Sequence, residues 1–199
     1  MPRVGNQSSS AVNPGVFALP GEPAFWTFIA ADSGLFALLF LQYCLDRASH
    51  LQGFIAEQST LAAGIAVVNT VILVTSSWAL AVAVQHASGG DRRLARQLVF
   101  TTSALGACFA ALKVVEYILE IRAGHSFVAG TFFMYYFIIT GIHLVHLLIG
   151  VLALTFIGAR CVRDSESSRD TVILECGASY WHLIDLLWMF IFPLTYLAR

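Results

Sequence analysis

The sequence predicts an all-α, polytopic membrane protein that forms one bundle of five transmembrane helices. Of the 199 residues, 58% are hydrophobic and only 12% are charged, about half the charged fraction of soluble domains. Five apolar segments are each long enough to cross the roughly 30 Å hydrocarbon core of a bilayer as a helix. The connections between these segments are short, so they leave no room for a domain outside the membrane.

The first predicted helix covers residues 24–45 and follows the sequence Leu19-Pro20-Gly21-Glu22-Pro23, where proline and glycine interrupt regular structure. Residues 1–20 are polar and are predicted to form an N-terminal tail. The remaining four helices are predicted from continuous apolar runs of spanning length. They cover residues 60–84, 94–119, 131–157 and 174–197, so that residues 21–199 form a single five-helix domain.

Small residues within these helices predict close contacts between them. Gly64 lies in the second helix, Gly106 in the third, and Gly141 and Gly150 in the fourth. Small side chains at helix interfaces in membranes allow the backbones to approach each other. The sequence therefore predicts tight packing of the middle three helices.

The distribution of Lys and Arg predicts the orientation of the chain. With the N-terminus in the cytoplasm, the inner segments carry seven of these residues and the outer segments carry three. The inner ones are Arg3, Arg92, Arg93, Arg96, Arg160, Arg163 and Arg169, and the outer ones are Arg47, Arg122 and Arg199. Because positive charges favour the cytoplasmic side, the N-terminus is predicted inside and the C-terminus outside.

Several ionisable residues lie inside the predicted helices, where an unpaired charge costs several kcal/mol. They are treated as a candidate network for proton transfer or for structure, comprising Asp32, Glu116, His143, His146, Glu175, His182 and Asp185. Lys113 precedes Glu116 by three residues, and His182 precedes Asp185 by three. Residues at this spacing share a helix face, so both pairs are predicted to neutralise themselves.

Asp32 differs from the other carboxylates because no cation lies three or four residues away. It therefore needs a partner from another helix, a water molecule or a bound proton. The predicted orientation places Asp32 and His182 towards the inner leaflet, so they are candidates to meet. Lys113 is expected to extend its amine towards the membrane surface while Glu116 is satisfied locally, which makes that pair structural.

The sequence also limits the classes of partner and cofactor. A net charge of −1 argues against nucleic acid as a partner. The four cysteines have no metal-ligand spacing. His143 and His146 lie on one helix and are expected to pack or to form hydrogen bonds between helices. A b-type haem held by His143 or His146 together with His182 is a weaker alternative, as is a proton or small-solute carrier acting alone.

Three motifs resemble those of subunit III of the haem-copper (cytochrome c) oxidases. Tyr180-Trp181-His182, followed by Asp185 and Trp188, resembles the last helix of that subunit. Residues 140–146, with the sequence TGIHLVH, resemble its TGxHxxH segment. A third block, with Glu116-Tyr117 and then Gly124-His125, also resembles the family, and Asp32 falls where the family has a glutamate.

Further segments resemble the short, five-helix NorE-like members associated with bacterial nitric oxide reductase. These segments are Pro20-Gly21-Glu22, Thr75-Ser76-Ser77-Trp78 and Phe132-Phe133-Met134-Tyr135-Tyr136.

The resemblance implies an accessory subunit of an oxidase or nitric oxide reductase in a bacterial inner membrane, with no redox centre of its own. It implies a catalytic partner that carries haem, with or without copper, and binding of phospholipid. It also implies a role in stabilising that partner and in supporting proton uptake. The alternative of an independent carrier predicts flux through the purified chain in liposomes.

Overall fold

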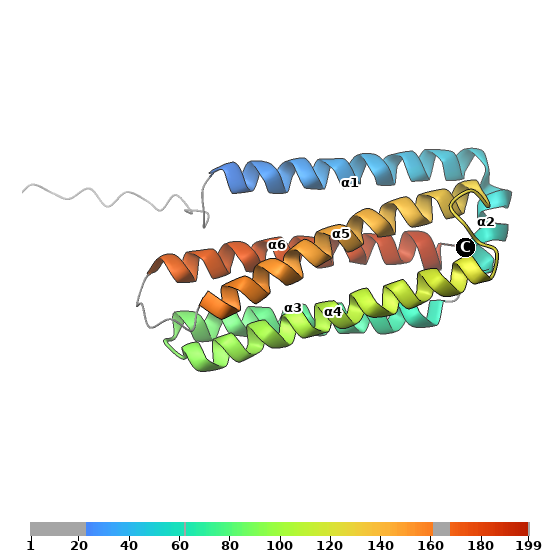
Figure 1. The fold of residues 1–199 in the computed structure, drawn as a ribbon. Helices are drawn as coiled ribbons and strands as arrows, with labels where there is room; N and C mark the ends of the chain where they lie inside the picture. Colours follow the sequence, from blue (N-terminus) through green and yellow to red (C-terminus); the bar gives the residue numbers. More distant parts are fainter. Residues whose placement is uncertain (1–22, 62, 161–167, 199) are drawn as a thin grey trace, which may run out of the picture.

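A computed structural model describes residues 23–61, 63–160 and 168–198, in which five long helices run side by side (Figure 1). The long helices are α1 (Pro23–Ser49), α3 (Ala63–Ser88), α4 (Arg92–Arg122), α5 (Thr131–Arg160) and α6 (Ser168–Phe192). All five are long and apolar enough to cross a membrane, which confirms the predicted fold class. The predicted N-terminal tail lies outside the described residues.

Each long helix extends beyond its predicted apolar segment at one end or at both, although α3 begins three residues later than predicted and α6 ends at Phe192. For example, α4 begins at Arg92 because Asp91 caps it, with its side chain accepting a hydrogen bond of 3.1 Å from the Leu94 backbone N–H. Its 31 residues correspond to about 46 Å at 1.5 Å per residue. That length matches the full bilayer with its headgroups rather than the hydrocarbon core alone.

The predicted connection between the first two helices, residues 46–59, is not simply a loop. It contains a short helix, α2 (Leu51–Ser59), which lies across one end of the bundle (Figure 1). The buried amide of Gln58 donates hydrogen bonds to the carbonyls of Leu194 (3.3 Å) and Thr195 (3.0 Å). These carbonyls belong to the π-helical turn Pro193–Leu197 that follows α6. Since the last carbonyls of a helix lack partners within it, α2 satisfies the end of α6.

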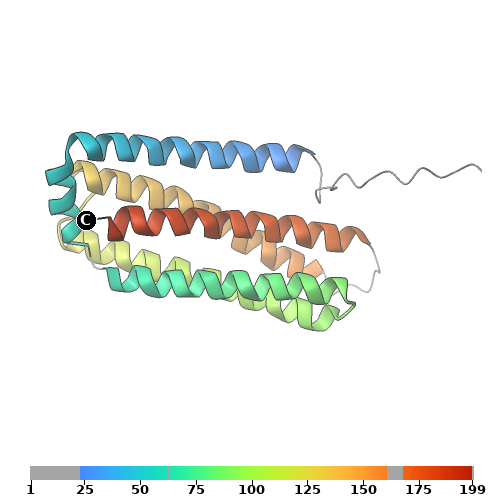
Figure 2. The same cartoon turned by 180° about the vertical axis from the view of Figure 1, so that it is seen from behind.

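Four of the long helices form a bundle in which α3 contacts α4 and α6, and α5 contacts the same two. Helix α1 packs more sparsely against α5 and α6, and the ribbon shows it set apart from α3 and α4 (Figure 2). The larger core is therefore built by α3 to α6, and α1 is held to it at one side.

The predicted close packing is confirmed at Gly106 and Gly150. A Cβ atom at Gly106 would lie 2.8 Å from Val151 Cγ2, and one at Gly150 would lie 3.1 Å from the Ile184 and Trp181 side chains. The prediction is wrong for Gly64 and Gly141, where a Cβ would meet nothing within 4 Å. The sequence predicted close contacts at all four glycines, because the position of a small residue in a helix does not show which face of that helix meets a neighbour.

Candidate functional site

The first polar cluster surrounds Lys113 and Glu116 near the end of α4 that adjoins α2. The Lys113 amine lies 3.1 Å from Glu116 Oε1, and it also donates to the hydroxyls of Tyr136 (3.1 Å) and Tyr196 (2.6 Å). Both tyrosine hydroxyls donate to Glu116 Oε1, at 2.7 Å from Tyr136. The predicted ion pair is thus present, and the Tyr136 and Tyr196 hydroxyls form hydrogen bonds with both Lys113 and Glu116.

The expectation that Lys113 reaches the membrane surface is wrong, because its side chain points into the bundle and the residue is 0% exposed. The amine lies over the rings of Tyr136 (4.7 Å) and Tyr196 (5.2 Å), and the Trp188 ring is 5.4 Å away. Aromatic faces attract a cation, particularly where water is excluded. This cluster joins α4, α5 and the end of α6, and its geometry is that of a structural connection.

The second cluster pairs Asp32 of α1 with His146 of α5. Asp32 Oδ1 lies 2.9 Å from His146 Nε2, and Asp32 is buried. Asp32 therefore pairs with His146. The sequence suggested His182 as its partner, but His182 contacts Ser77 instead. The ring of Phe36 packs edge-on against His146 at 5.6 Å.

Both ring nitrogens of His146 face a polar atom. One of them, Nδ1, lies 2.8 Å from the carbonyl oxygen of Ile142, an atom that can only accept a hydrogen bond. Nδ1 must then carry a proton, and Nε2 faces a carboxylate oxygen. Nε2 and Oδ1 lie 2.9 Å apart, a distance at which the imidazole and the carboxyl group can share one hydrogen bond. The Asp32–His146 pair is thus a buried contact between a carboxyl group and an imidazole that joins α1 to α5.

The third cluster contains Ser77 of α3 with His182 and Asp185 of α6. His182 Nδ1 lies 2.6 Å from Ser77 Oγ. Neither oxygen of Asp185 makes a hydrogen bond of good geometry with the described residues, although the Ser77 hydroxyl lies near it and the residue is only 8% exposed. The predicted His182–Asp185 pair is therefore wrong, since the imidazole turns towards α3 instead. All three residues line an open pocket of about 250 Å³.

The two remaining candidates, His143 and Glu175, lie apart from these pairs. His143 is fully buried between the rings of Phe109 (5.9 Å) and Trp188 (5.3 Å). Neither of its ring nitrogens has a hydrogen-bond partner within the described chain. Glu175 is half-buried on α6. The candidates thus fall into separate sites, and His146 and His182, two proposed haem ligands, contact different helices.

Sequence reasoning missed the hydroxyl groups that complete two of these sites. Tyr136 and Tyr196 were part of aromatic stretches, yet both are buried, and a buried tyrosine hydroxyl usually has a partner. Searching the apolar helices for tyrosines whose hydroxyls need partners would have identified Tyr136 and Tyr196 as candidates. Ser77 gave no such signal, because serine in a membrane helix commonly bonds to its own backbone.

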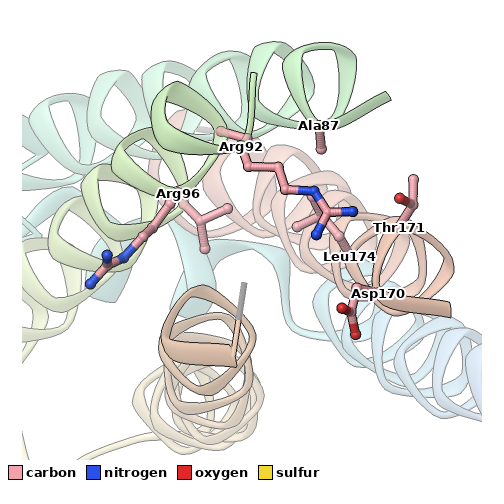
Figure 3. Close-up of a pocket in the computed structure, with 8 residues that line it drawn as sticks. Ala87, Arg92, Arg96, Asp170, Thr171 and Leu174 are labelled. Carbon is pink, nitrogen blue, oxygen red and sulfur yellow. The ribbon is translucent and has the colours of Figure 1, made fainter. Parts of the chain in front are cut away.

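The opposite end of the bundle from α2 carries a small pocket of about 20 Å³ between α4 and α6. Arg92 extends across this pocket towards Asp170 and Thr171, whereas the guanidinium of Arg96 points away from them (Figure 3). This pocket lies in the arginine-rich part of the chain and contains none of the candidate residues.

Known proteins resemble this chain over most of its length. Residues 54–198 match the family model described as cytochrome c oxidase subunit III. Cytochrome c oxidase subunit 3 of Bacillus sp. (strain PS3) is 27% identical over 173 residues, which cover 87% of this chain and 83% of that protein. Quinol oxidase subunit 3 of Bacillus subtilis is 24% identical over 173 residues, 87% of this chain and 84% of that protein.

A third relative, from Aeropyrum pernix, is named heme-copper oxidase subunit I+III. It is 25% identical over 182 residues, covering 88% of this chain and 22% of that protein. The family match includes most of α2 and all of α3 to α6, and with them the three motifs noted in the sequence. The chain therefore belongs to the cytochrome c oxidase subunit III family.

Proposed function

We propose that this chain is the accessory subunit III of a haem-copper oxidase and packs against the catalytic subunit that carries the redox centres. The observation that carries the proposal is the family match over residues 54–198, which include four of the five long helices. The relatives are named as subunits of cytochrome c and quinol oxidases. The Aeropyrum pernix protein, whose name joins subunits I and III, supports a partnership with a subunit I.

Purification of the tagged chain from its native membranes in mild detergent tests this function. A haem-bearing protein should copurify, which a visible spectrum and the masses of the copurified chains would detect. Recovery of a colourless homo-oligomer would contradict the proposal.

A nitric oxide reductase is the second candidate partner, favoured by the segments that resemble NorE-like proteins. The length of the chain does not favour it, because the Bacillus oxidase subunits match over 83% and 84% of their own lengths. Consumption of oxygen compared with nitric oxide by the purified complex distinguishes the two partners.

We also propose that the chain lies in a bacterial inner membrane with its N-terminus in the cytoplasm. The start of α1, the turn between α3 and α4, and the end of α5 lie at one end of the bundle (Figure 1). That end carries Arg92, Arg93, Arg96 and Arg160. Positive charge favours the cytoplasmic side and attracts anionic phospholipid headgroups, which supports both this orientation and lipid binding there.

The Asp32–His146 pair supports a role in proton uptake, since it places two groups that can bind a proton in contact between α1 and α5. Asp32→Asn should leave assembly unchanged and slow turnover of the complex about tenfold where transfer of this proton limits the rate, since an amide cannot release a proton. Turnover would be measured with the haem content of the preparation as the reference.

Glu120→Gln is the matched control for this substitution. Glu120 also pairs with an imidazole, at 2.7 Å from His125 Nδ1, but it lies at the opposite end of the bundle. The Glu120→Gln substitution should therefore leave turnover of the complex unchanged. Normal turnover of Asp32→Asn would exclude a role of Asp32 in proton delivery.

A further inference from the structure

Asp185 stands out among the buried carboxylates because neither of its oxygens makes a hydrogen bond of good geometry within the described part of the chain, and only the Ser77 hydroxyl lies close enough to interact with it. By contrast, one oxygen of Asp32 meets His146, and one oxygen of Glu116 accepts from Lys113 and two tyrosines. Ser77 has a single O–H and can satisfy at most one of the two oxygens. A buried carboxylate oxygen without a hydrogen bond is destabilising, so a further donor is needed from outside the described residues.

We propose that the α3–α6 face around Asp185 is the docking surface for a transmembrane helix of the haem-bearing catalytic subunit. A side-chain N–H or O–H of that helix enters the pocket and donates to Asp185. This inference rests on the function proposed above, and it adds which face of the chain meets the partner and by what chemistry.

The depth of Asp185 restricts what can reach it. The candidate membrane span formed by α6 and the turn after it covers 28 residues, Asp170–Leu197, and Asp185 lies within two residues of its middle. At 1.5 Å per residue this is roughly 3 Å from the midplane, whereas headgroups lie about 15 Å away. Acyl chains carry no donor, so lipid packed on this face would leave the carboxylate unpaired.

The surface around the pocket suits a helix that is mostly apolar with one polar side chain. The pocket of about 250 Å³ is lined by Ser77, His182 and Asp185 together with apolar side chains. Three of the apolar ones, Val74, Leu186 and Met189, are half exposed, at 52%, 55% and 50%. An apolar rim around a polar centre is typical of a specific contact between membrane helices, where polar groups bond across the interface.

The other side of α6 is already occupied within the chain. Helix α1 packs against α5 and α6, and its Tyr43 hydroxyl donates to the Leu194 carbonyl at 2.8 Å. The α3–α6 pocket has no such cover from the described residues, so it is free for a partner subunit.

Photocrosslinking in the intact complex tests the position of this surface. p-Benzoylphenylalanine is introduced in place of Leu186 or Met189, and in control chains in place of Leu152 of α5 or Leu38 of α1, which are 70% and 67% exposed. Irradiation of membranes should join the Leu186 or Met189 variant to the haem-bearing subunit. Adducts at these two positions that contain only lipid or a second copy of this chain would overturn the proposal.

Substitution of Asp185 tests the chemistry of the contact. Asp185→Leu removes the acceptor and leaves the partner's donor unsatisfied, so the amount of haem-bearing subunit retained on the tagged chain should fall about tenfold. Asp185→Asn keeps an acceptor and should retain most of it. Glu175→Leu, on the same helix but outside the pocket, is the matched control and should match the wild type. Circular dichroism would verify that each variant is folded.

The outcomes separate this inference from the proposed function. If the wild-type chain retains no haem-bearing subunit, the proposed function fails and the docking surface fails with it. If the wild-type chain and Asp185→Leu retain it equally, the function stands and this docking surface is wrong.

Discussion

Replacement of Lys113 by methionine is expected to destabilise the folded bundle by about 3–5 kcal/mol, because it removes one partner of a buried ion pair. Glu116 is 2% exposed and would keep only its two tyrosine donors. Methionine has a volume close to that of the lysine stem, so lost packing contributes little. Thermal unfolding of the chain in detergent, followed by circular dichroism near pH 8, would measure the loss.

The double variant Lys113→Met/Glu116→Gln is the control for the charge. A neutral amide can still accept from Tyr136 and Tyr196, so the double variant should recover much of the lost stability. Equal instability of the single and double variants would show that the methionine is poorly packed rather than that the charge is stranded. No change in the single variant would contradict the buried pair itself.

A methyl group at Gly106 is expected to destabilise the bundle by about 1–3 kcal/mol, the usual cost of overpacking a filled core. The added Cβ would lie 2.5 Å from the Trp181 ring and 2.8 Å from Val151 Cγ2. The ring is held in place because its N–H donates to Ser76 Oγ at 3.1 Å. Helices α4, α5 and α6 would have to separate, which thermal unfolding of Gly106→Ala would detect.

Gly141→Ala makes the same chemical change where no atom lies within 4 Å of the new Cβ. It should be neutral or stabilise α5 by about 0.5–1 kcal/mol, since alanine is the better helix former. Combining Gly106→Ala with Trp181→Phe should recover part of the loss, because phenylalanine does not reach as far. Equal effects of the two glycine substitutions would contradict a close contact at Gly106.

Patterns local to one helix were predictable from the sequence. The five long helices followed from apolar composition, because a membrane span needs a fixed length of apolar side chains. The Lys113–Glu116 pair followed from a spacing of three residues, since both ends of the contact lie on α4. Three motifs in order were also sufficient to indicate the family, which the match over residues 54–198 supports.

Contacts between helices were not predictable in the same way. The same three-residue spacing predicted a His182–Asp185 pair, yet the His182 ring turns to Ser77 on α3. Asp32 was known to need a partner, but several histidines were available at membrane depth. The choice of His146 depends on which face of α1 meets α5, and that is set by the packing of the whole bundle.

The sequence by itself determined that this chain spans a membrane, where its five long helices lie and which ionisable residues they carry. The tertiary structure decided how those residues are paired, because side-chain direction and helix rotation are settled only when all the helices pack together. It also showed that Asp185 is buried beside Ser77 without a hydrogen bond of good geometry inside the described chain. The docking surface proposed around Asp185 depends on the groups that surround its carboxylate in three dimensions, and the spacing of residues along α6 does not predict them.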